Sequence, residues 1–172
     1  MKWEKRFEIM RRLCGQPEGK TIADLGAETS EGERISSVFD NKNDVQLFGR
    51  EHGHDFEKRI EAKKDSFDVI IAGDVIEHLI KPTFFVKEIY RITKRGGILV
   101  LSVPNSCSLK NRVRTLLGKS TMNGAFADFS RDFHFSSWNM DSVCELIEKC
   151  GFRIEHKCSR FLECCIVKAT KK

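Results

Sequence analysis

Hydrophobic residues recur along the chain at two spacings, one typical of amphipathic helices and one typical of buried strands. A helix is predicted within residues 1–18, where apolar side chains follow at intervals of four, three and four residues: Trp3, Phe7, Met10 and Cys14. A second stripe begins after Pro82, whose ring suits the first turn of a helix. A third follows Asn139, a residue that can cap a helix. These stripes predict helices that pack one face against a core.

Short apolar runs between the helical stripes predict strands. The predicted strands span residues 21–26, 45–48, 67–73, 98–103, 152–158 and 163–169. After the first of them, Ser30 and Glu33 have the spacing of a capping box, so a helix should follow. The last two strands are joined by few residues and should form an antiparallel hairpin. This alternation predicts an α/β fold with a mostly parallel sheet, whose ligands bind at the carboxyl ends of the strands.

Composition places the chain among soluble globular proteins. Its 172 residues correspond to about one domain, spanning 1–172. They are 40% hydrophobic and 32% charged, and they contain no apolar run of the length that a membrane span needs. Seven scattered cysteines without an export signal favour a reducing, cytoplasmic environment over a disulfide framework. We therefore expect a cytoplasmic protein with no membrane partner. The net charge of +5 favours a solvated basic surface over a nucleic-acid footprint, and the oligomeric state is open.

Four segments resemble class I S-adenosylmethionine-dependent methyltransferases, and together they cover roughly residues 20–169. They are Ile22–Gly26, Phe67–Leu79, Gly96–Asn105 and His134–Phe152. The resemblance implies a Rossmann-like, seven-stranded sheet with helices on both faces and a C-terminal antiparallel hairpin. It also implies S-adenosylmethionine as cofactor and a methyl acceptor that the sequence does not identify. The region between Phe48 and Phe67, which should hold a strand and one or two helices, is shortened, so the third strand is expected to be reduced.

The cofactor loop departs from the glycine-rich pattern of the family. Gly26 is kept, whereas Glu28 and Ser30 stand where two further glycines are usual. A side chain at 28 adds bulk and negative charge near the methionyl end of the cofactor. Alternatively, Glu28 and Ser30 serve the start of the following helix. The cofactor-binding residues implied by the resemblance are Asp24, Gly26, Ala27, Glu28, Glu51, Asp55 and Asp74, although Glu51 also reads as a surface acid.

Candidate chemistry follows the strand at 67–73. Glu77, His78 and His134 are the candidate catalytic residues, because an imidazole can take a proton from an acceptor hydroxyl near neutral pH. Some methyltransferases bind a divalent metal through a similar acid-x-x-Glu-His segment. The resemblance thus extends to a metal site of Asp74, Glu77, His78 and His134, although no metal is the favoured prediction. A packed or backbone-bonded His134 is the alternative.

A lid-like insertion is expected at residues 106–137, over the predicted cleft. Its cations, Lys110, Arg112, Arg114 and Lys119, would meet an anionic acceptor or form a solvated face. Three functions remain open from the sequence. The first is methyl transfer to a small-molecule or macromolecular acceptor. The second is a methyltransferase-like binding or regulatory module that has lost the cofactor. The third, not favoured, is a nucleic-acid-binding module.

Overall fold

The computed structural model describes residues 3–26, 34–119, 134–159 and 163–172, which build one six-stranded sheet. The strands are β1 (Thr21–Leu25), β2 (Asp44–Phe48), β3 (Phe67–Gly73), β4 (Thr93–Pro104), β5 (Phe152–Cys158) and β6 (Cys164–Lys171). The helices are α1 (Trp3–Cys14), α2 (Pro82–Ile92), α3 (Leu109–Leu116) and α4 (Met140–Lys149), with the 3-10 turns η1 (Ser36–Phe39), η2 (Arg50–His52) and η3 (Ile76–His78).

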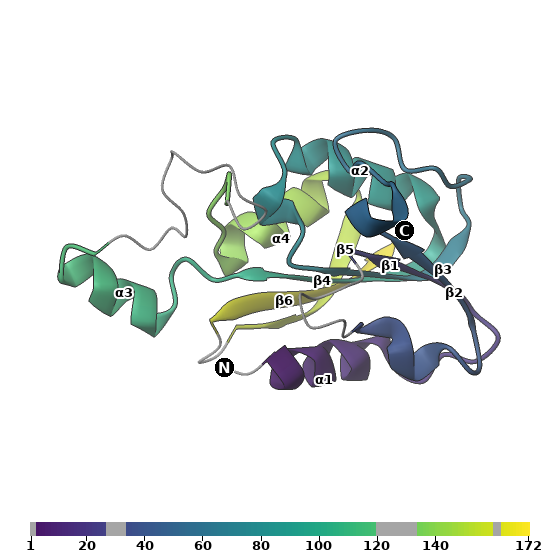
Figure 1. The fold of residues 1–172 in the computed structure, drawn as a ribbon, viewed down its shortest axis with the longest axis horizontal. Helices are drawn as coiled ribbons and strands as arrows, with labels where there is room; N and C mark the ends of the chain where they lie inside the picture. The colour runs from purple at the N-terminus through teal and green to yellow at the C-terminus, as the bar shows by residue number, and fades with distance from the viewer. Residues whose placement is uncertain (1–2, 27–33, 120–133, 160–162) are drawn as a thin grey trace.

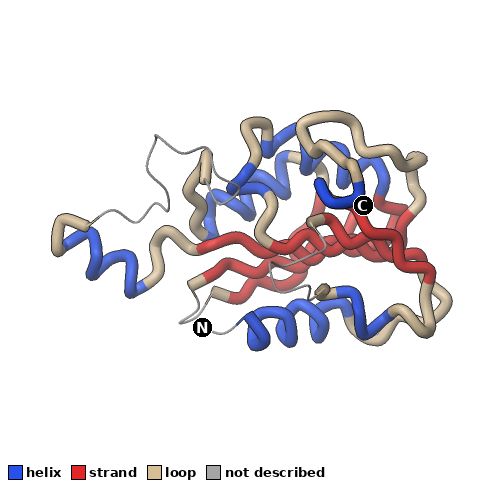
Figure 2. The backbone as a smooth tube through the Cα atoms, viewed as in Figure 1, coloured by secondary structure: helices blue, strands red, loops and turns tan. Residues whose placement is uncertain are grey.

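The sheet has the strand order β2-β1-β3-β4-β6-β5, and helices lie on both of its faces. Strands β2, β1, β3 and β4 are parallel, whereas β6 runs antiparallel to both β4 and β5. The helix α1 covers one face, and α2 and α4 cover the other (Figures 1 and 2). The predicted helices on both faces and the predicted final hairpin are therefore confirmed. Neighbouring strands end in register, with Leu25 opposite Ala72 and Gly73 opposite Ser102, so the loops that follow them meet at one edge.

The prediction of seven strands is wrong, because residues 49–66 form no strand. This segment is fully described and contains only η2 and turns before β3 begins. Its charged sequence has no alternating apolar pattern, and Phe56 and Ile60 are its only buried hydrophobic side chains. Two anchors suffice to hold a loop against the core, but they cannot form the apolar face of a strand. As a result, β2 forms one edge of the sheet, and β5 forms the other.

Local signals explain where several elements begin. The side chain of Asn139 accepts a hydrogen bond from the Ser142 amide at 2.9 Å, and Ser142 Oγ accepts one from the Asn139 amide at 3.0 Å. The helix α4 therefore starts with a capping box. The helix predicted after Ser30 is replaced, within the described part of the chain, by the single turn η1. Ser30 and Glu33 themselves lie outside the described residues. The exposed Val38 shows that the apolar spacing seen there does not form a full helical face.

Two apolar layers, one on each face of the sheet, enclose most of the cysteines. Cys14, Cys144, Cys150, Cys164 and Cys165 are buried without disulfides, and burial raises the pKa of Cys14, Cys164 and Cys165 to about 12. These thiols behave as small hydrophobic side chains, in agreement with the prediction. Within the described chain, no helix combines the length and the apolar composition needed to cross a bilayer.

Candidate functional site

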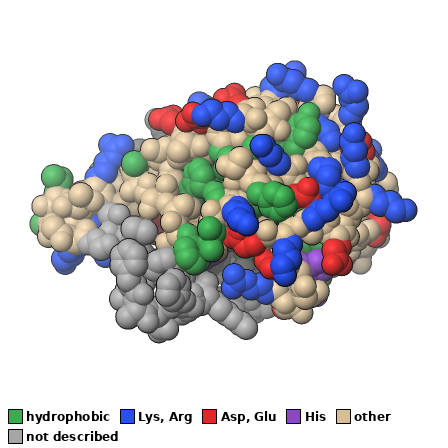
Figure 3. Space-filling model, turned by 90° about the horizontal axis from the view of Figure 1, so that it is seen from above, with side chains coloured by type: hydrophobic (Ala, Val, Ile, Leu, Met, Phe, Trp, Pro, Cys, Tyr) green, Lys and Arg blue, Asp and Glu red, His purple; other side chains and the backbone are tan. Residues whose placement is uncertain are grey.

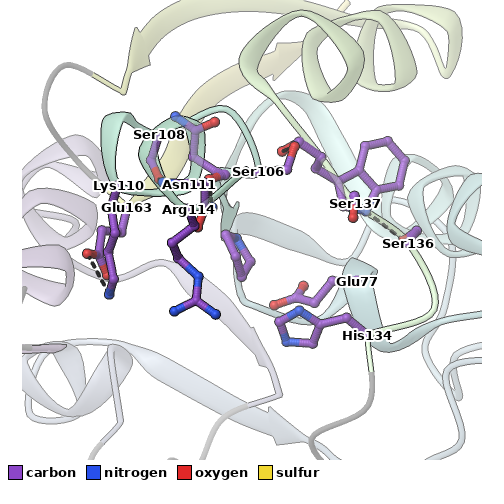
Figure 4. Close-up of a pocket in the computed structure, with 13 residues that line it drawn as sticks. Glu77, Ser106, Ser108, Lys110, Asn111, Arg114, His134, Ser136, Ser137 and Glu163 are labelled. Atoms are coloured by element: carbon purple, nitrogen blue, oxygen red, sulfur yellow. Dashed lines mark hydrogen bonds and ion pairs between the residues drawn. The ribbon is translucent and has the colours of Figure 1, made fainter. Parts of the chain in front are cut away.

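A pocket of about 190 Å³ opens at the carboxyl end of β4, where the sequence places the ligand site of a parallel sheet. The end of β4, the helix α3, the turn η3 and the segment before α4 each supply one wall (Figure 4). Its lining residues are mostly polar: Glu77, Pro104, Asn105, Ser106, Ser108, Lys110, Asn111, Arg114, His134, Ser136, Ser137, Trp138 and Glu163. A volume of this size suits a small molecule or one reactive group of a larger acceptor.

The turn after β3 brings Glu77 into the wall of this pocket. Asp74 adopts a left-handed conformation with φ of 53°, and its amide donates to the Ser102 carbonyl at 3.0 Å. The chain therefore leaves β3 sharply and forms η3, which buries Ile76 and Glu77. The amide of Phe135 then donates to the Glu77 carbonyl at 2.8 Å. This bond holds the segment before α4 against η3, although the two are more than fifty residues apart in sequence.

The carboxylate of Glu77 is buried without a hydrogen bond from the described residues. The residue is 1% exposed, and neither carboxylate oxygen has a hydrogen-bond partner in that part of the chain. The imidazole of His78 lies beside it, with Nε2 3.8 Å from Oε1. Burial first, and repulsion from Asp74 second, raise the pKa of Glu77 well above its usual value, whereas Arg6 opposes the shift. The raised pKa makes the Glu77 carboxylate a stronger base than that of an exposed glutamate.

Two imidazoles stand beside this carboxylate. The rings of His78 and His134 lie 4.8 Å apart and meet edge to face at 80°. One ligand-type atom from each of Glu77, His78 and His134 lies within 4.8 Å of the other two. All three candidate catalytic residues are therefore brought together from two distant segments.

Asp74, the fourth residue of the predicted metal site, is held elsewhere. Its carboxylate forms an ion pair with Arg6 of α1, and its Oδ1 accepts a hydrogen bond from Ser102 Oγ at 2.8 Å. Both side chains of the ion pair are largely buried. Asp74 thus joins α1 to the sheet and is not part of the cluster of Glu77, His78 and His134.

The residues implied for the cofactor lie at the carboxyl end of β1. Asp24 is 1% exposed and accepts a hydrogen bond from the Ser36 amide at 3.0 Å. Burial raises its pKa to about 6, and the hydrogen bonds from Ser36 oppose that shift. Gly26 has a φ of +76°, and a β-carbon there would lie 2.6 Å from Val75 Cγ2. Glycine therefore permits the close approach of this loop to the turn after β3, while Ala27 and Glu28 lie outside the described residues.

The two candidates for the nucleoside end of the cofactor are exposed. Glu51 lies in η2, where its carboxylate folds back over Gly49. Asp55 accepts a hydrogen bond from the Glu57 amide at 3.0 Å, which is the main cause that lowers its pKa. Neither residue lines the pocket. Their contacts stabilise local turns, and a cofactor role for them rests on the resemblance alone.

Several pocket residues were not predicted as site residues from the sequence. Asn105 and Trp138 form an isolated bridge between the end of β4 and the segment before α4, and the indole of Trp138 donates to Ser136 Oγ at 2.8 Å. Asn111 donates to the Asn105 carbonyl at 2.9 Å, which fixes the start of α3 to the end of β4. Asn105 directly follows a buried strand, and this position was the only sequence signal that could have found it. Trp138 carried no such signal.

Comparison with known proteins assigns the family. A family model described as a methyltransferase domain matches residues 10–157, which is most of the chain. The chain therefore belongs to the methyltransferase domain family. It is also 32% identical over 90 residues to a Mycolicibacterium smegmatis protein described as a probable S-adenosylmethionine-dependent methyltransferase. That alignment covers 52% of this chain and 30% of the relative, so the chain spans less than a third of that protein's length.

Solved structures share the fold at low sequence identity. A chain of the complex that contains the Haloferax volcanii Trm112 methyltransferase activator aligns with a TM-score of 0.67 at 15% identity, covering 97% of this chain and 91% of that one. The cyclase SpnF aligns with a TM-score of 0.68 at 14% identity, covering 98% and 81% of the two chains. Since one of these relatives is named as a cyclase, the fold alone does not identify the reaction.

Proposed function

We propose that the protein is an S-adenosylmethionine-dependent methyltransferase whose acceptor binds in the pocket between η3, the end of β4 and α3. The observation that carries this proposal is the buried carboxylate of Glu77, which lies on the pocket wall beside two imidazoles. Membership of the methyltransferase domain family supports the reaction type. The acceptor is not identified, and the size of the pocket favours a small molecule or an exposed group of a larger one.

The side chains of this site can position an acceptor and move its proton. When bound, S-adenosylmethionine supplies a methyl group on a sulfonium, which an acceptor oxygen, nitrogen or sulfur can attack directly. As an acceptor hydroxyl oxygen bonds to the methyl carbon, the sulfur–methyl bond would break and leave S-adenosylhomocysteine, and Glu77 or one of the imidazoles takes the proton of the hydroxyl. Burial raises the pKa of Glu77, which makes its carboxylate a stronger base than that of an exposed glutamate. Ser136, Trp138 and Asn111 surround the acceptor and orient it, which is the larger part of catalysis for an activated methyl donor.

The described part of the cofactor cradle is compatible with the proposed cofactor. Gly26 allows a close backbone turn at the end of β1, and Asp24 stabilises the neighbouring segment through the Ser36 amide. Ala27 and Glu28 would complete the methionyl side, with Glu51 and Asp55 proposed for the nucleoside side. Asp74 would support the adjoining wall from its ion pair with Arg6.

Calorimetric titration with S-adenosylmethionine and S-adenosylhomocysteine tests the proposal. Micromolar binding is expected, and release of S-adenosylhomocysteine can then be followed across a panel of small hydroxyl, amine and thiol acceptors. The absence of binding up to millimolar concentration would overturn the proposal and would favour a methyltransferase-like module without cofactor. The variant Glu28→Gly separates the two readings of the unusual loop: tighter binding would mean that Glu28 obstructs the site.

The residues that converge at the pocket also have the chemistry of a metal site, with one carboxylate and two imidazoles. Glu77, His78 and His134 would hold a divalent cation, which would polarise an acceptor oxygen. Transfer in the presence of EDTA decides between the two uses of the cluster. Full activity would assign Glu77 and the imidazoles to proton transfer alone, whereas loss of activity that added metal restores would assign them to a cation.

A further inference from the structure

The helix α3 carries an apolar stripe that stays exposed in the part of the protein that the structure describes. Leu109, Val113 and Leu116 recur at intervals of four and three residues, so they share one face of the helix. Their exposed fractions are 71%, 47% and 85%, and Leu117 at the end of the helix is 67% exposed. A folded protein normally buries such a stripe, and α3 has no buried residue at all.

Cations border the apolar stripe on both sides. With 3.6 residues per turn, Lys110 falls on one flank of the stripe and Arg112 on the other, whereas Asn111 and Thr115 lie opposite it. Lys119, just beyond the helix, adds a further positive charge, and residues 106–119 contain no acidic side chain. Lys110 Nζ lies 3.0 Å from Glu163 Oε1, but both side chains are more than 40% exposed, so this ion pair is weak. The helix thus presents an apolar stripe inside a positively charged border.

The position of α3 leaves this stripe open to a broad surface. The helix lies beyond the carboxyl end of β4, away from the sheet and from the helices that cover its two faces (Figure 1). Hydrophobic and Lys or Arg side chains lie close together at that end of the molecule (Figure 3). The stripe is aliphatic, and it lacks the tyrosine and tryptophan anchors that dominate protein interfaces. An aliphatic stripe flanked by cations is the pattern of a helix that lies in the interface of an anionic bilayer.

We propose that α3 docks the protein on an anionic membrane surface. Leu109, Val113, Leu116 and Leu117 enter the acyl boundary, and the bordering cations meet lipid phosphates. We expected no membrane partner because the sequence has no apolar run long enough to span a bilayer. A short helix that lies on the membrane surface needs no such run. Since α3 supplies one wall of the pocket, docking of this helix would place the pocket next to the lipid surface. The inference goes beyond the proposed methyl transfer and does not depend on cofactor binding.

Sedimentation of the full chain with lipid vesicles tests the proposal. Vesicles of phosphatidylcholine with about one third phosphatidylglycerol should bind the protein at least tenfold more tightly than phosphatidylcholine alone. Leu116→Asp should weaken this binding at least tenfold. Its matched control is Ile80→Asp, at an exposed apolar residue outside α3, which should bind as the unchanged protein does. Arg112→Gln should weaken binding about fivefold, and Arg95→Gln, at an exposed site elsewhere, should not.

Each alternative outcome overturns the proposal in a different way. Equal binding of Leu116→Asp would place the membrane contact outside α3 or reduce it to charge alone. A failure to bind anionic vesicles, together with a dimer in sedimentation velocity that Leu116→Asp dissociates, would assign the stripe to a second copy of the chain. A monomer that binds no vesicles would remove the membrane role altogether. Circular dichroism of each variant checks that it is folded, which substitutions at exposed positions should preserve.

Discussion

Asp24 lies near the end of β1, and Glu77 lies in the turn after β3, the parallel neighbour of β1. Both carboxylates are buried, yet their surroundings differ. Both are 1% exposed, and burial raises the pKa of each. Asp24 accepts a hydrogen bond from the Ser36 amide, whereas Glu77 has no hydrogen-bond partner within the described chain. Asp24 does not line the pocket, whose wall contains Glu77.

The difference separates a carboxylate that organises the fold from one that is available for chemistry. A hydrogen bond to the charged form offsets part of the desolvation of Asp24 and fixes the segment after the cofactor loop. Glu77 accepts no hydrogen bond from a described side chain, and the charge of Arg6 offsets only part of its desolvation, so the buried carboxylate is costly to retain. A residue of this kind is expected where function requires it, because a hydrophobic side chain would stabilise the fold better.

The largest effect is expected from Glu77→Gln. The amide keeps the shape of the side chain but cannot take a proton, so turnover with a hydroxyl acceptor should fall by about 10²–10⁴-fold. The free energy of unfolding should not fall, because the amide removes a charge that burial disfavours and no described hydrogen bond is lost. Initial rates of S-adenosylhomocysteine release and thermal unfolding measure the two quantities.

Glu61→Gln is the control for this prediction, since Glu61 is exposed and lies outside the pocket. It should retain full activity. If Glu77→Gln also retained full activity, Glu77 would not be the base. The difference between Glu77 and Asp24 would then have no role in catalysis.

A smaller effect, on stability, is expected from Asp24→Asn. The folded-state pKa of Asp24 rises from 3.8 to about 6, so the folded protein disfavours its charged form. Its contribution to stability is therefore present below about pH 4 and is lost as the pH rises through about 6. Relative to the unchanged protein, Asp24→Asn should gain up to about 3 kcal/mol between pH 4 and pH 7. The asparagine oxygen can still accept the bond from Ser36.

Urea unfolding of both proteins across this pH range provides the measurement. A constant difference between the two would show that Asp24 has the same pKa folded and unfolded. In that case burial would not raise the pKa of Asp24 beyond what the Ser36 hydrogen bonds offset.

The smallest effect tests how closely the two strand ends approach each other. Gly26→Ala introduces both a left-handed alanine and a contact with Val75, whereas Gly53→Ala introduces only the left-handed alanine, because no atom lies within 4 Å of its β-carbon. Gly53→Ala should therefore destabilise by about 1 kcal/mol, and Gly26→Ala by about 1–2 kcal/mol more. Chemical denaturation of the two variants measures the difference.

Equal destabilisation by the two substitutions would mean that Val75 moves aside without cost. A Gly26→Ala/Val75→Ala double variant separates the contact from the backbone strain, because only the contact couples the two sites.

Much of the fold could be predicted because local signals and periodicity agree. The capping position of Asn139, the helix start at Pro82 and the apolar run of β3 each specify an element from neighbouring residues alone. The missing strand is the instructive failure. The number of strands was carried over from the family, whereas the charged sequence of residues 49–66 has no strand pattern of its own.

The sequence by itself determined which residue types follow each strand, and hence the candidates Asp24, Asp74, Glu77 and His78. Only the tertiary structure decided which of them converge. Asp74 and Glu77 are three residues apart, yet a left-handed turn directs Asp74 to Arg6 of α1 and buries Glu77 against His134. Sequence spacing cannot predict this division. It depends on a long-range ion pair and on backbone bonds to Phe135, which form only when α1 and the segment before α4 pack against the same strand ends.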